Sequence, residues 1–285
     1  MKRIGVIIPV YNGEKSIEKS IESLLSQTFN DWVAIIVNDG STDNTSKILN
    51  KYMNDNRFHI CHFSKNKGRP YARQKGLEIV KELNLKYMCM LDADDWYYPE
   101  KLDYQYQFME SHPNIALLSS AIGVTNKQQE LFRVIKPFPK RQYFRFNNYL
   151  NYMVIPHASS IIRVYEINSN LNYNYTLSFS EDQDFLRRLL INKDYVFDPL
   201  IQYIYNREDS FSLYKYHRSM YYNYKSFKNL NLGFKANIIR KFKNIIKFNL
   251  VRTLSLIQCE KIYLSKVGIN PTQSESFQYL KNQNK

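Results

Sequence analysis

The chain has 285 residues and is 44% hydrophobic, enough for one large domain with a full core, and its net charge is +14. It contains no apolar run of about 18 residues, which excludes a membrane-spanning helix. The three cysteines form no Cys-x-x-Cys pair, which is typical of reduced thiols in a cytoplasmic protein.

The order of apolar runs predicts an α/β fold. Strands are expected at residues 4–8, 32–37, 58–63, 87–91, 115–120, 159–164 and 195–203, and helices at 14–27, 42–53, 70–83, 100–110 and 181–191. Residues 121–158 are less regular. Regular alternation of strands and helices predicts a mostly parallel central sheet flanked by helices.

The charge divides the chain into two parts. Residues 215–285 contain 14 Lys and Arg but 2 acidic residues, whereas residues 1–214 contain 26 basic and 24 acidic residues. The second part is also rich in Asn and in helix-forming residues. We therefore predict a main domain over residues 1–214 and a basic helical C-terminal extension over residues 215–285.

The most informative motif follows the strand expected at 87–91, where Asp92, Asp94 and Asp95 come close together. Three neighbouring carboxylates repel one another. A divalent cation such as Mg²⁺ would relieve this repulsion, because it takes carboxylates together with substrate phosphates as ligands. Ligands bind at the carboxyl ends of strands in open α/β sheets, which favours a metal that grips a diphosphate. The alternative is a solvated acidic turn that caps the next helix.

Other strand ends carry further candidates. The turn Pro9-Val10-Tyr11-Asn12-Gly13 follows the first strand, and Asp39 follows the second, where its carboxylate can accept a hydrogen bond from a nucleobase or ribose. Arg69 and Arg73 share one face of the helix expected after the third strand. Two guanidiniums near a helix N-terminus favour a phosphate, although a solvated basic turn is the alternative, chiefly for Arg69.

A second acidic run, Glu181-Asp182-Gln183-Asp184, opens a later helix after Ser180. Acidic residues in a first turn complement the helix dipole, and Ser is a common N-cap residue. An acid at the edge of a cleft that holds a diphosphate can instead act as a general base. The spacing alone leaves both interpretations open.

In this order, the segments resemble the signature of glycosyltransferase family 2 on the GT-A fold. They are Pro9-Val10-Tyr11-Asn12, Asn38-Asp39-Gly40-Ser41-Thr42-Asp43, Asn66-x-Gly68 with Ala72-Arg73, Asp92-Ala93-Asp94-Asp95 and Glu181-Asp182. The resemblance covers about two thirds of the chain.

The resemblance implies a role for each matching residue. It implies that Pro9, Tyr11 and Asp39 line the nucleotide pocket and that Arg73 lies near the phosphates. It also implies that Asp94, with Asp92, binds Mn²⁺ or Mg²⁺, and that Asp182 is the catalytic base, with Glu181 orienting the acceptor or the base. From their positions in the same motifs, Asn12, Arg69 and Asp92 are expected to contact the donor as well.

Two stretches depart from the family pattern, and a His outside them needs separate comment. Many members carry Trp-Gly-Gly before the Glu-Asp pair, where this chain has Ser178-Phe179-Ser180. Many also carry a Tyr-Arg…His element, where residues 205–210 here contain no His; Arg207 is expected to contact the diphosphate instead. His157 falls where relatives often place a His, and it is either a buried structural residue or part of the active site.

The implied reaction is an inverting transfer of a sugar from a nucleoside-diphosphate sugar, expected to be a UDP-sugar, to a hydroxyl of a glycan or lipid-linked saccharide, as in O-antigen, capsule or lipooligosaccharide assembly. A sugar nucleotidyltransferase is one alternative, but the turn at residues 9–13 is too poor in Gly for a triphosphate loop. A nucleic-acid-binding protein is another, but no base-contacting motif accompanies the positive charge. No nucleic-acid partner is therefore expected.

Residues 234–257 form a basic amphipathic pattern in which apolar residues recur at helical spacing between Lys and Arg. Such a pattern suits the surface of an anionic membrane, so peripheral attachment to the inner face of the cytoplasmic membrane is one expectation. Packing of the apolar face on the main domain is the other.

Overall fold

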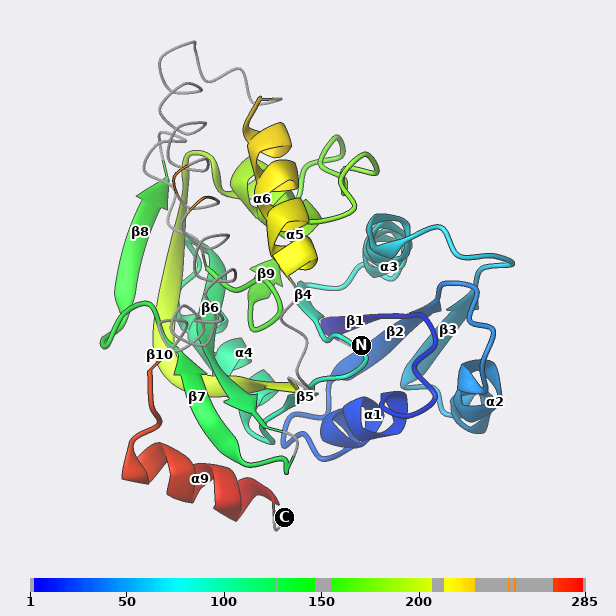
Figure 1. The fold of residues 1–285 in the computed structure, drawn as a ribbon, viewed down its shortest axis with the longest axis horizontal. Helices are drawn as coiled ribbons and strands as arrows, with labels where there is room; N and C mark the ends of the chain where they lie inside the picture. The colour runs from blue at the N-terminus through cyan, green and yellow to red at the C-terminus, as the bar shows by residue number, and fades with distance from the viewer. Residues whose placement is uncertain are drawn as a thin grey trace.

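The computed structural model describes residues 3–126, 128–146, 155–206, 213–228 and 269–283, together with Ile246 and Asn249 (Figure 1). In these residues one ten-stranded sheet has the order β3-β2-β1-β4-β9-β6-β10-β5, with β7 paired to β6 and β8 to β10. Helices cover both faces of the sheet (Figure 1). Arg207 and almost all of residues 234–257 lie outside the described residues.

The first half of the sheet is parallel. Its strands are β1 (Ile4–Val10), β2 (Trp32–Asn38), β3 (Phe58–His62) and β4 (Tyr87–Met90). Every residue of β1, β2 and β4 is buried, because helices lie on both sides. This explains why these strands appear in the sequence as continuous apolar runs.

Alternate side chains of β1 enter the two cores on opposite faces of the sheet. Ile7 packs in one core with Leu77 of α3 (Arg69–Glu82), whereas Ile8 packs in the other with Ile21 of α1 (Ile17–Leu25). Each fully buried aliphatic side chain contributes about 1.5–3 kcal/mol to folding. The two helices therefore fix β1, and with it the turn that follows Val10.

The second half of the sheet is mixed. β6 (Ile115–Thr125) and β10 (Lys193–Asn206) pair in parallel, and β9 (Ile161–Arg163) lies antiparallel between β4 and β6. Three further strands, not expected from the sequence, pair antiparallel to this half: β5 (Trp96–Tyr97), β7 (Leu131–Ile135) and β8 (Gln142–Phe146).

The remaining predicted helices are present with shifted ends. α4 spans Lys101–Ser111 and α5 spans Glu181–Leu190. The helix expected over residues 42–53 is shorter: α2 spans Thr45–Leu49 and continues as a 3₁₀ turn over Asn50–Tyr52. Thr, Ser and Asn are weak helix formers, and they occupy the start and end of this segment.

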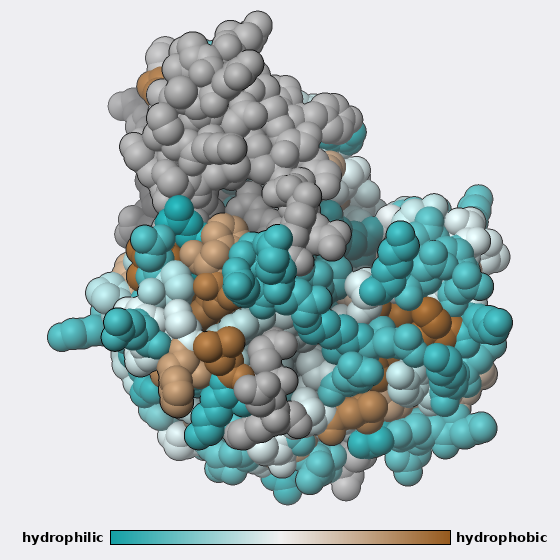
Figure 2. Space-filling model, turned by 60° about the horizontal axis from the view of Figure 1, so that its bottom comes forward, coloured by the Kyte–Doolittle hydropathy of each residue, from teal (hydrophilic) through white to brown (hydrophobic). Residues whose placement is uncertain are grey.

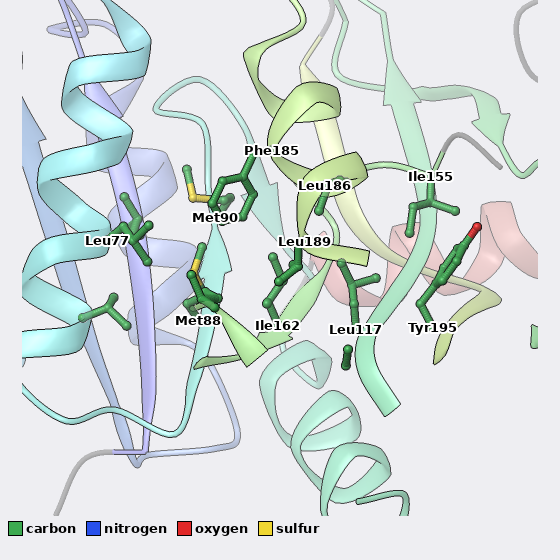
Figure 3. Close-up of a cluster of buried hydrophobic side chains, with 14 of the residues drawn as sticks. Leu77, Met88, Met90, Leu117, Ile155, Ile162, Phe185, Leu186, Leu189 and Tyr195 are labelled. Atoms are coloured by element: carbon green, nitrogen blue, oxygen red, sulfur yellow. The ribbon is translucent and has the colours of Figure 1, made fainter. Parts of the chain in front are cut away.

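Helix α5 lies on the sheet over β4 and β9. Figure 3 shows Phe185 and Leu189 of α5 beside Met90, Met88 and Ile162, all of which belong to one buried cluster. This packing sets the N-terminus of α5 near the carboxyl end of β4. The two acidic motifs of the sequence are thus brought to the same side of the molecule.

The described parts of the C-terminal region contact the rest of the chain. α6 (Leu213–Lys228) lies against α5, and the predicted boundary at residue 214 falls inside it. α9 (Gln273–Gln283) lies beside β7, where the Ile269 and Val134 backbones pair and Lys136 Nζ lies 2.8 Å from Glu275 Oε1.

The described helices include none with the length and apolarity needed to cross a membrane. Among the residues coloured in Figure 2, which looks from the lower side of Figure 1, hydrophilic ones predominate and apolar ones form separate small patches.

Candidate active site

Parallel pairing brings the predicted site residues to one edge of the sheet. Val10 is in register with Asn38, and Ile7 with Met90, so the segments after β1, β2 and β4 emerge together. A cavity of about 330 Å³ is lined there by residues that include Pro9, Tyr11, Asp39, Arg69 and Tyr175. A second, of about 340 Å³, is lined by residues that include Pro9, Tyr11, Asn12, Arg69, Asp92 and Asp94. The two cavities are neighbours, because they share Pro9, Val10, Tyr11 and Arg69.

Asp39 organises the wall of the first cavity. Its Oδ1 accepts a hydrogen bond from the Lys67 backbone N–H (2.7 Å) and its Oδ2 accepts one from Gly68 (2.8 Å). Gly40 is required next to it: its φ is +68°, and a Cβ there would lie 2.3 Å from the Lys65 carbonyl carbon. Each oxygen of Asp39 keeps a lone pair with which it can accept a further hydrogen bond from a ligand.

Asn12 joins the two turns that follow β1 and β2. Its Oδ1 accepts a hydrogen bond from the Thr42 backbone N–H (2.9 Å), and its own N–H donates to Ser41 Oγ (2.9 Å). The residue has a φ of 52°, in the left-handed region that Asn tolerates. Asn12 therefore shapes the edge of the second cavity as well as lining it.

Arg73 connects the two acidic motifs. Its Nη1 lies 2.9 Å from Glu181 Oε1 and its Nη2 lies 3.2 Å from Asp92 Oδ1. The residue is 3% exposed and lines neither cavity. Burial lowers the pKa of Arg73, but Glu181 and Asp92 outweigh it and raise the pKa overall, so the guanidinium stays charged.

Arg69 takes the more open position. Its side chain is 51% exposed, its Nε lies 3.6 Å from Glu181 Oε1, and it lines both cavities. The structure thus brings both predicted arginines to the site, but only Arg69 reaches the space that a ligand can enter.

Glu181 and Asp182 have pKa values displaced in opposite directions. Burial raises the pKa of Glu181, although Arg73 and Arg69 oppose it. Burial also raises the pKa of Asp182, but Arg73 and then His157 outweigh it, so this pKa is lowered. Two neighbouring acids with separated pKa values are typical of acid–base sites. The lowered pKa of Asp182 favours its ionised form. Neither acid lines either of the two cavities, although Arg73 links Glu181 to Asp92, which lines the second one.

His157 is buried within the electrostatic reach of the same residues. Its Nε2 lies 3.2 Å from the Tyr173 hydroxyl, and its Nδ1 has no hydrogen-bond partner within the described part of the chain. Burial and the nearby Arg73 charge lower the pKa of His157 to about 4, so the ring is neutral at pH 7. It lines neither cavity.

The last acid of each motif is turned into the protein. Asp95 is fully buried and accepts hydrogen bonds from the Tyr203 hydroxyl (2.6 Å) and the Asn206 backbone N–H (2.9 Å). Asp184 is also buried and accepts one from Ser226 Oγ (2.6 Å). These two acids hold structure together rather than face a ligand.

The departure from the family pattern before Glu181 coincides with contacts to α6. Ser180 adopts a left-handed conformation (φ 58°), where Gly is favoured, and its Oγ lies 3.2 Å from the Ser219 carbonyl. The Phe179 ring stacks on Tyr222 with centroids 6.0 Å apart. α6 thus takes part in shaping the segment that precedes the acidic pair.

The carboxylates at the second cavity have the chemistry of a site for a hard cation. No group of three His, Cys, Asp or Glu side chains suited to a metal occurs among the residues with a described position. Asp92 and Asp94 both line the cavity, and Mg²⁺ is commonly held by one or two carboxylates plus substrate phosphates. The donor set therefore fits Mg²⁺ or Mn²⁺ in the presence of a diphosphate.

Several lining residues were not predicted. Tyr175 and Ser178 line the first cavity, and Ser16 and Tyr205 line the second. Tyr205, near the end of β10, begins the stretch 205–210 that gave a signal in the sequence. Tyr175 lies between motifs, and no pattern in the sequence singles it out.

Comparison with known proteins gives consistent matches. The family model described as Glycosyl transferase family 2 matches residues 5–169. An uncharacterized glycosyltransferase of Methanocaldococcus jannaschii is 30% identical over 207 residues, covering 70% of this chain and 69% of that protein. The putative teichuronic acid biosynthesis glycosyltransferase TuaG of Bacillus subtilis is 39% identical over 107 residues, which are 37% of this chain and 41% of TuaG.

Solved structures share the fold. S. aureus TarS (residues 1–349) in complex with UDP matches with a TM-score of 0.61 and 21% identity, over 98% of this chain and 78% of that one. The mannosyltransferase PcManGT from Pyrobaculum calidifontis, in complex with GDP-Man and Mn²⁺, matches with a TM-score of 0.61 and 10% identity, over 99% and 86% of the two chains. These matches confirm the predicted GT-A type of α/β fold.

Proposed function

The chain belongs to glycosyl transferase family 2, and from this premise we propose that it transfers a sugar with inversion from a nucleoside-diphosphate sugar to a hydroxyl of a glycan or lipid-linked saccharide. That the protein is a glycosyltransferase follows from its family and its relatives. The donor, the acceptor and the stereochemistry are the proposed part.

One observation carries the proposal: two neighbouring cavities share the end of β1, and they offer different chemistry. The first has the Asp39 carboxylate, which suits the N–H and O–H donors of a nucleoside. The second has Asp92 and Asp94, which suit a diphosphate bound through a cation. A nucleoside diphosphate laid across Pro9 and Tyr11 would use both.

The negative charge of the leaving diphosphate has to be neutralised. Bound Mn²⁺ or Mg²⁺ would supply it at Asp94 and Asp92 by neutralising the negative charge that develops on the leaving group. Arg69 lines both cavities, so its exposed guanidinium is the cation of this chain best suited to hold the phosphates. Arg73 instead holds Asp92 and Glu181 in place. Arg207 stays a prediction.

Asp182 is the proposed base. Its lowered pKa keeps it ionised, so it can accept the proton of an acceptor hydroxyl as that hydroxyl attacks the sugar. Attack on the side opposite to the diphosphate inverts the anomeric centre. Glu181 is engaged by Arg73 and Arg69, which favours an orienting role for it.

The relatives support the choice of substrates. TarS has been solved with UDP and with UDP-GlcNAc, and PcManGT with GDP-Man and Mn²⁺. A UDP-sugar is therefore the first donor to test, with a GDP-sugar as the second. The likeness to TuaG supports a role in surface-polysaccharide assembly. Attachment of residues 234–257 to an anionic membrane would suit a lipid-linked acceptor, and it stays a prediction.

Slow hydrolysis of nucleotide sugars tests the proposal. Wild type should release UDP or GDP from one donor in the presence of Mn²⁺, and chelation should abolish the release. Asp94→Ala should lose this hydrolysis, and Asp182→Asn should lower it about 10²- to 10⁴-fold with nucleotide affinity retained. Asp184→Asn is the control for a buried acid of the same helix and should keep the hydrolysis per folded molecule. Full metal-dependent activity in Asp94→Ala and Asp182→Asn would refute the assignment.

A further inference from the structure

The outer wall of the first cavity comes from a segment that the family match does not cover. The match ends at residue 169, whereas Tyr175 and Ser178 line the cavity together with Asp39. Residues 171–178 lead into α5 and therefore lie directly before the acidic pair. This segment is the part of the cavity wall that lies outside the family match.

The segment is fixed at both ends. The Tyr173 backbone N–H donates to Gln74 Oε1 of α3 (3.0 Å), and the Tyr173 ring stacks on Phe185 of α5 with centroids 4.3 Å apart. Lys225 of α6 donates to the Thr176 carbonyl (3.3 Å). Three helices thus hold these residues in place, and Tyr175 is part of a built wall.

Tyr175 also forms an aromatic pair with Tyr71 of α3. Their ring centroids are 4.1 Å apart and their planes differ by 14°. Tyr175 remains 43% exposed and Tyr71 41% exposed. Tyr71 covers one face of the Tyr175 ring, so the cavity meets the ring at its other face or its edge. A ligand in the cavity would bury aromatic surface that the protein itself leaves in water.

We propose that the nucleobase of the donor nucleotide packs against Tyr175, and that Tyr71 positions the Tyr175 ring for this contact. The inference rests on the proposed function for the nature of the donor. The cavity supplies what a base needs: a carboxylate on Asp39 for its N–H groups and aromatic surface for its π-face, since Tyr11 lines the same cavity and is 49% exposed.

Calorimetry with two ligands tests the contact. Each titration contains Mn²⁺ and uses either the nucleoside diphosphate that wild type binds more tightly (UDP or GDP) or ribose 5-diphosphate, which has no base. Tyr175→Ala should lower the affinity for the nucleotide about tenfold, because stacking of one base contributes about 1–3 kcal/mol. It should lower the affinity for ribose 5-diphosphate less than twofold. Tyr175→Phe, the matched control, should bind both ligands as wild type does.

Tyr71 provides a second pair of variants. Tyr71→Ala should lower the affinity for the nucleotide by a smaller factor than Tyr175→Ala, because it removes the ring that supports Tyr175 and not the ring that contacts the base. Tyr71→Phe should leave the affinity unchanged. Both rings are partly exposed, so the thermal midpoints of the two Phe variants should match that of wild type. The two Ala variants lose the ring pair and should remain folded with slightly lower midpoints.

The outcomes separate the two proposals. A wild type that binds neither UDP nor GDP overturns the proposed function and this inference with it. A wild type that binds nucleotide while Tyr175→Ala binds it equally well overturns the inference alone. The inference alone is also overturned if Tyr175→Ala weakens the binding of ribose 5-diphosphate by the same factor as that of the nucleotide. It is likewise overturned if only the KM for a saccharide acceptor changes, because the ring would then contact the acceptor.

Discussion

The two acidic motifs are built on different backbones, and in each of them the last acid is buried. In the turn after β4, Asp92 and Asp94 line a cavity while Asp95 is buried under Tyr203. In the first turn of α5, Glu181 and Asp182 lie at Arg73, while Asp184 is buried under α6. The acids of one run in the sequence therefore fall into two kinds, and only one kind is available to a ligand.

The motifs differ in how their charge is balanced. At α5, the buried Arg73 lies between Glu181 and Asp92 and compensates them without any ligand. At β4, the pKa of Asp95 is raised well above its usual range by burial, with Asp94 and Asp92 adding to the effect. Arg73 thus serves both motifs, since Asp92 belongs to the turn after β4, whereas Glu181 has a second cation nearby in Arg69.

Removal of the shared counterion should have the largest effect on stability. Arg73→Met leaves Glu181, whose side chain is 2% exposed, without its closest cation. Loss of one partner of a buried pair costs about 3–5 kcal/mol, so the free energy of unfolding in urea should fall by that amount. Arg69→Met is the control: Arg69 reaches the same carboxylate at 3.6 Å, but its side chain is 51% exposed, so the loss should stay below about 1 kcal/mol.

A double variant sharpens this test. Arg73→Met with Glu181→Gln removes the uncompensated charge and should recover much of the lost stability. Equal losses in Arg73→Met and Arg69→Met would show that Arg73 is not the counterion of this motif.

The pH dependence of stability should come largely from His157 and the neighbouring Asp182 of α5. The pKa of His157 is about 4 in the folded protein and near 6.5 in an unfolded chain, so the unfolded state binds the proton more readily. The contribution of the neutral ring is complete above pH 6.5 and is lost as the pH falls toward 4, by about 3 kcal/mol. Arg73, Tyr173, Asp92 and Asp182 face this ring, and the lowered pKa of Asp182 acts in the same direction.

Urea unfolding at pH 7, 5.5 and 4.5 measures this slope. His157→Gln has no titrating ring, and its unfolding free energy should fall less steeply than that of wild type over this range. Identical slopes for both proteins would mean that His157 is as easily protonated in the folded chain as in the unfolded one.

Much of the fold could be predicted because buried strands leave a strong signal. β1, β2 and β4 are buried along their whole length and almost entirely apolar, and the helices between them show periodicity. β7 and β8 were missed because their side chains are largely exposed or half-buried, and the partner of β8, β10, is also distant in sequence. β5 has two residues, too few for any periodicity.

The site could be predicted as far as strand ends determine it. Asp39 and the Asp92–Asp94 turn follow from the position of β2 and β4 in the chain. The fate of Asp95 could not be predicted, because its hydroxyl partner Tyr203 lies 108 residues away. Tyr175 was missed for the same reason, since its stacking partner Tyr71 belongs to another element. Local pattern marks where polar residues gather, and tertiary contacts decide which of them face the ligand.

The smallest predicted effect concerns the anchor of the buried acid in α5. Ser226 is fully buried, donates to Asp184 Oδ1 (2.6 Å) and accepts a hydrogen bond from Arg187 Nη2 (2.7 Å). Ser226→Ala should lower the free energy of unfolding by about 1–3 kcal/mol, because Asp184 and Arg187 each lose a buried partner. Ser274→Ala on the exposed surface of α9 is the matched control and should change it by less than about 0.5 kcal/mol.

Nucleotide affinity should stay at the wild-type value in Ser226→Ala, because Asp184 lines neither cavity. If this variant instead bound nucleotide more weakly with unchanged stability, Asp184 would have to face the ligand. The division of the acids in α5 would then differ from that in the turn after β4, since the buried position would belong to the ligand site.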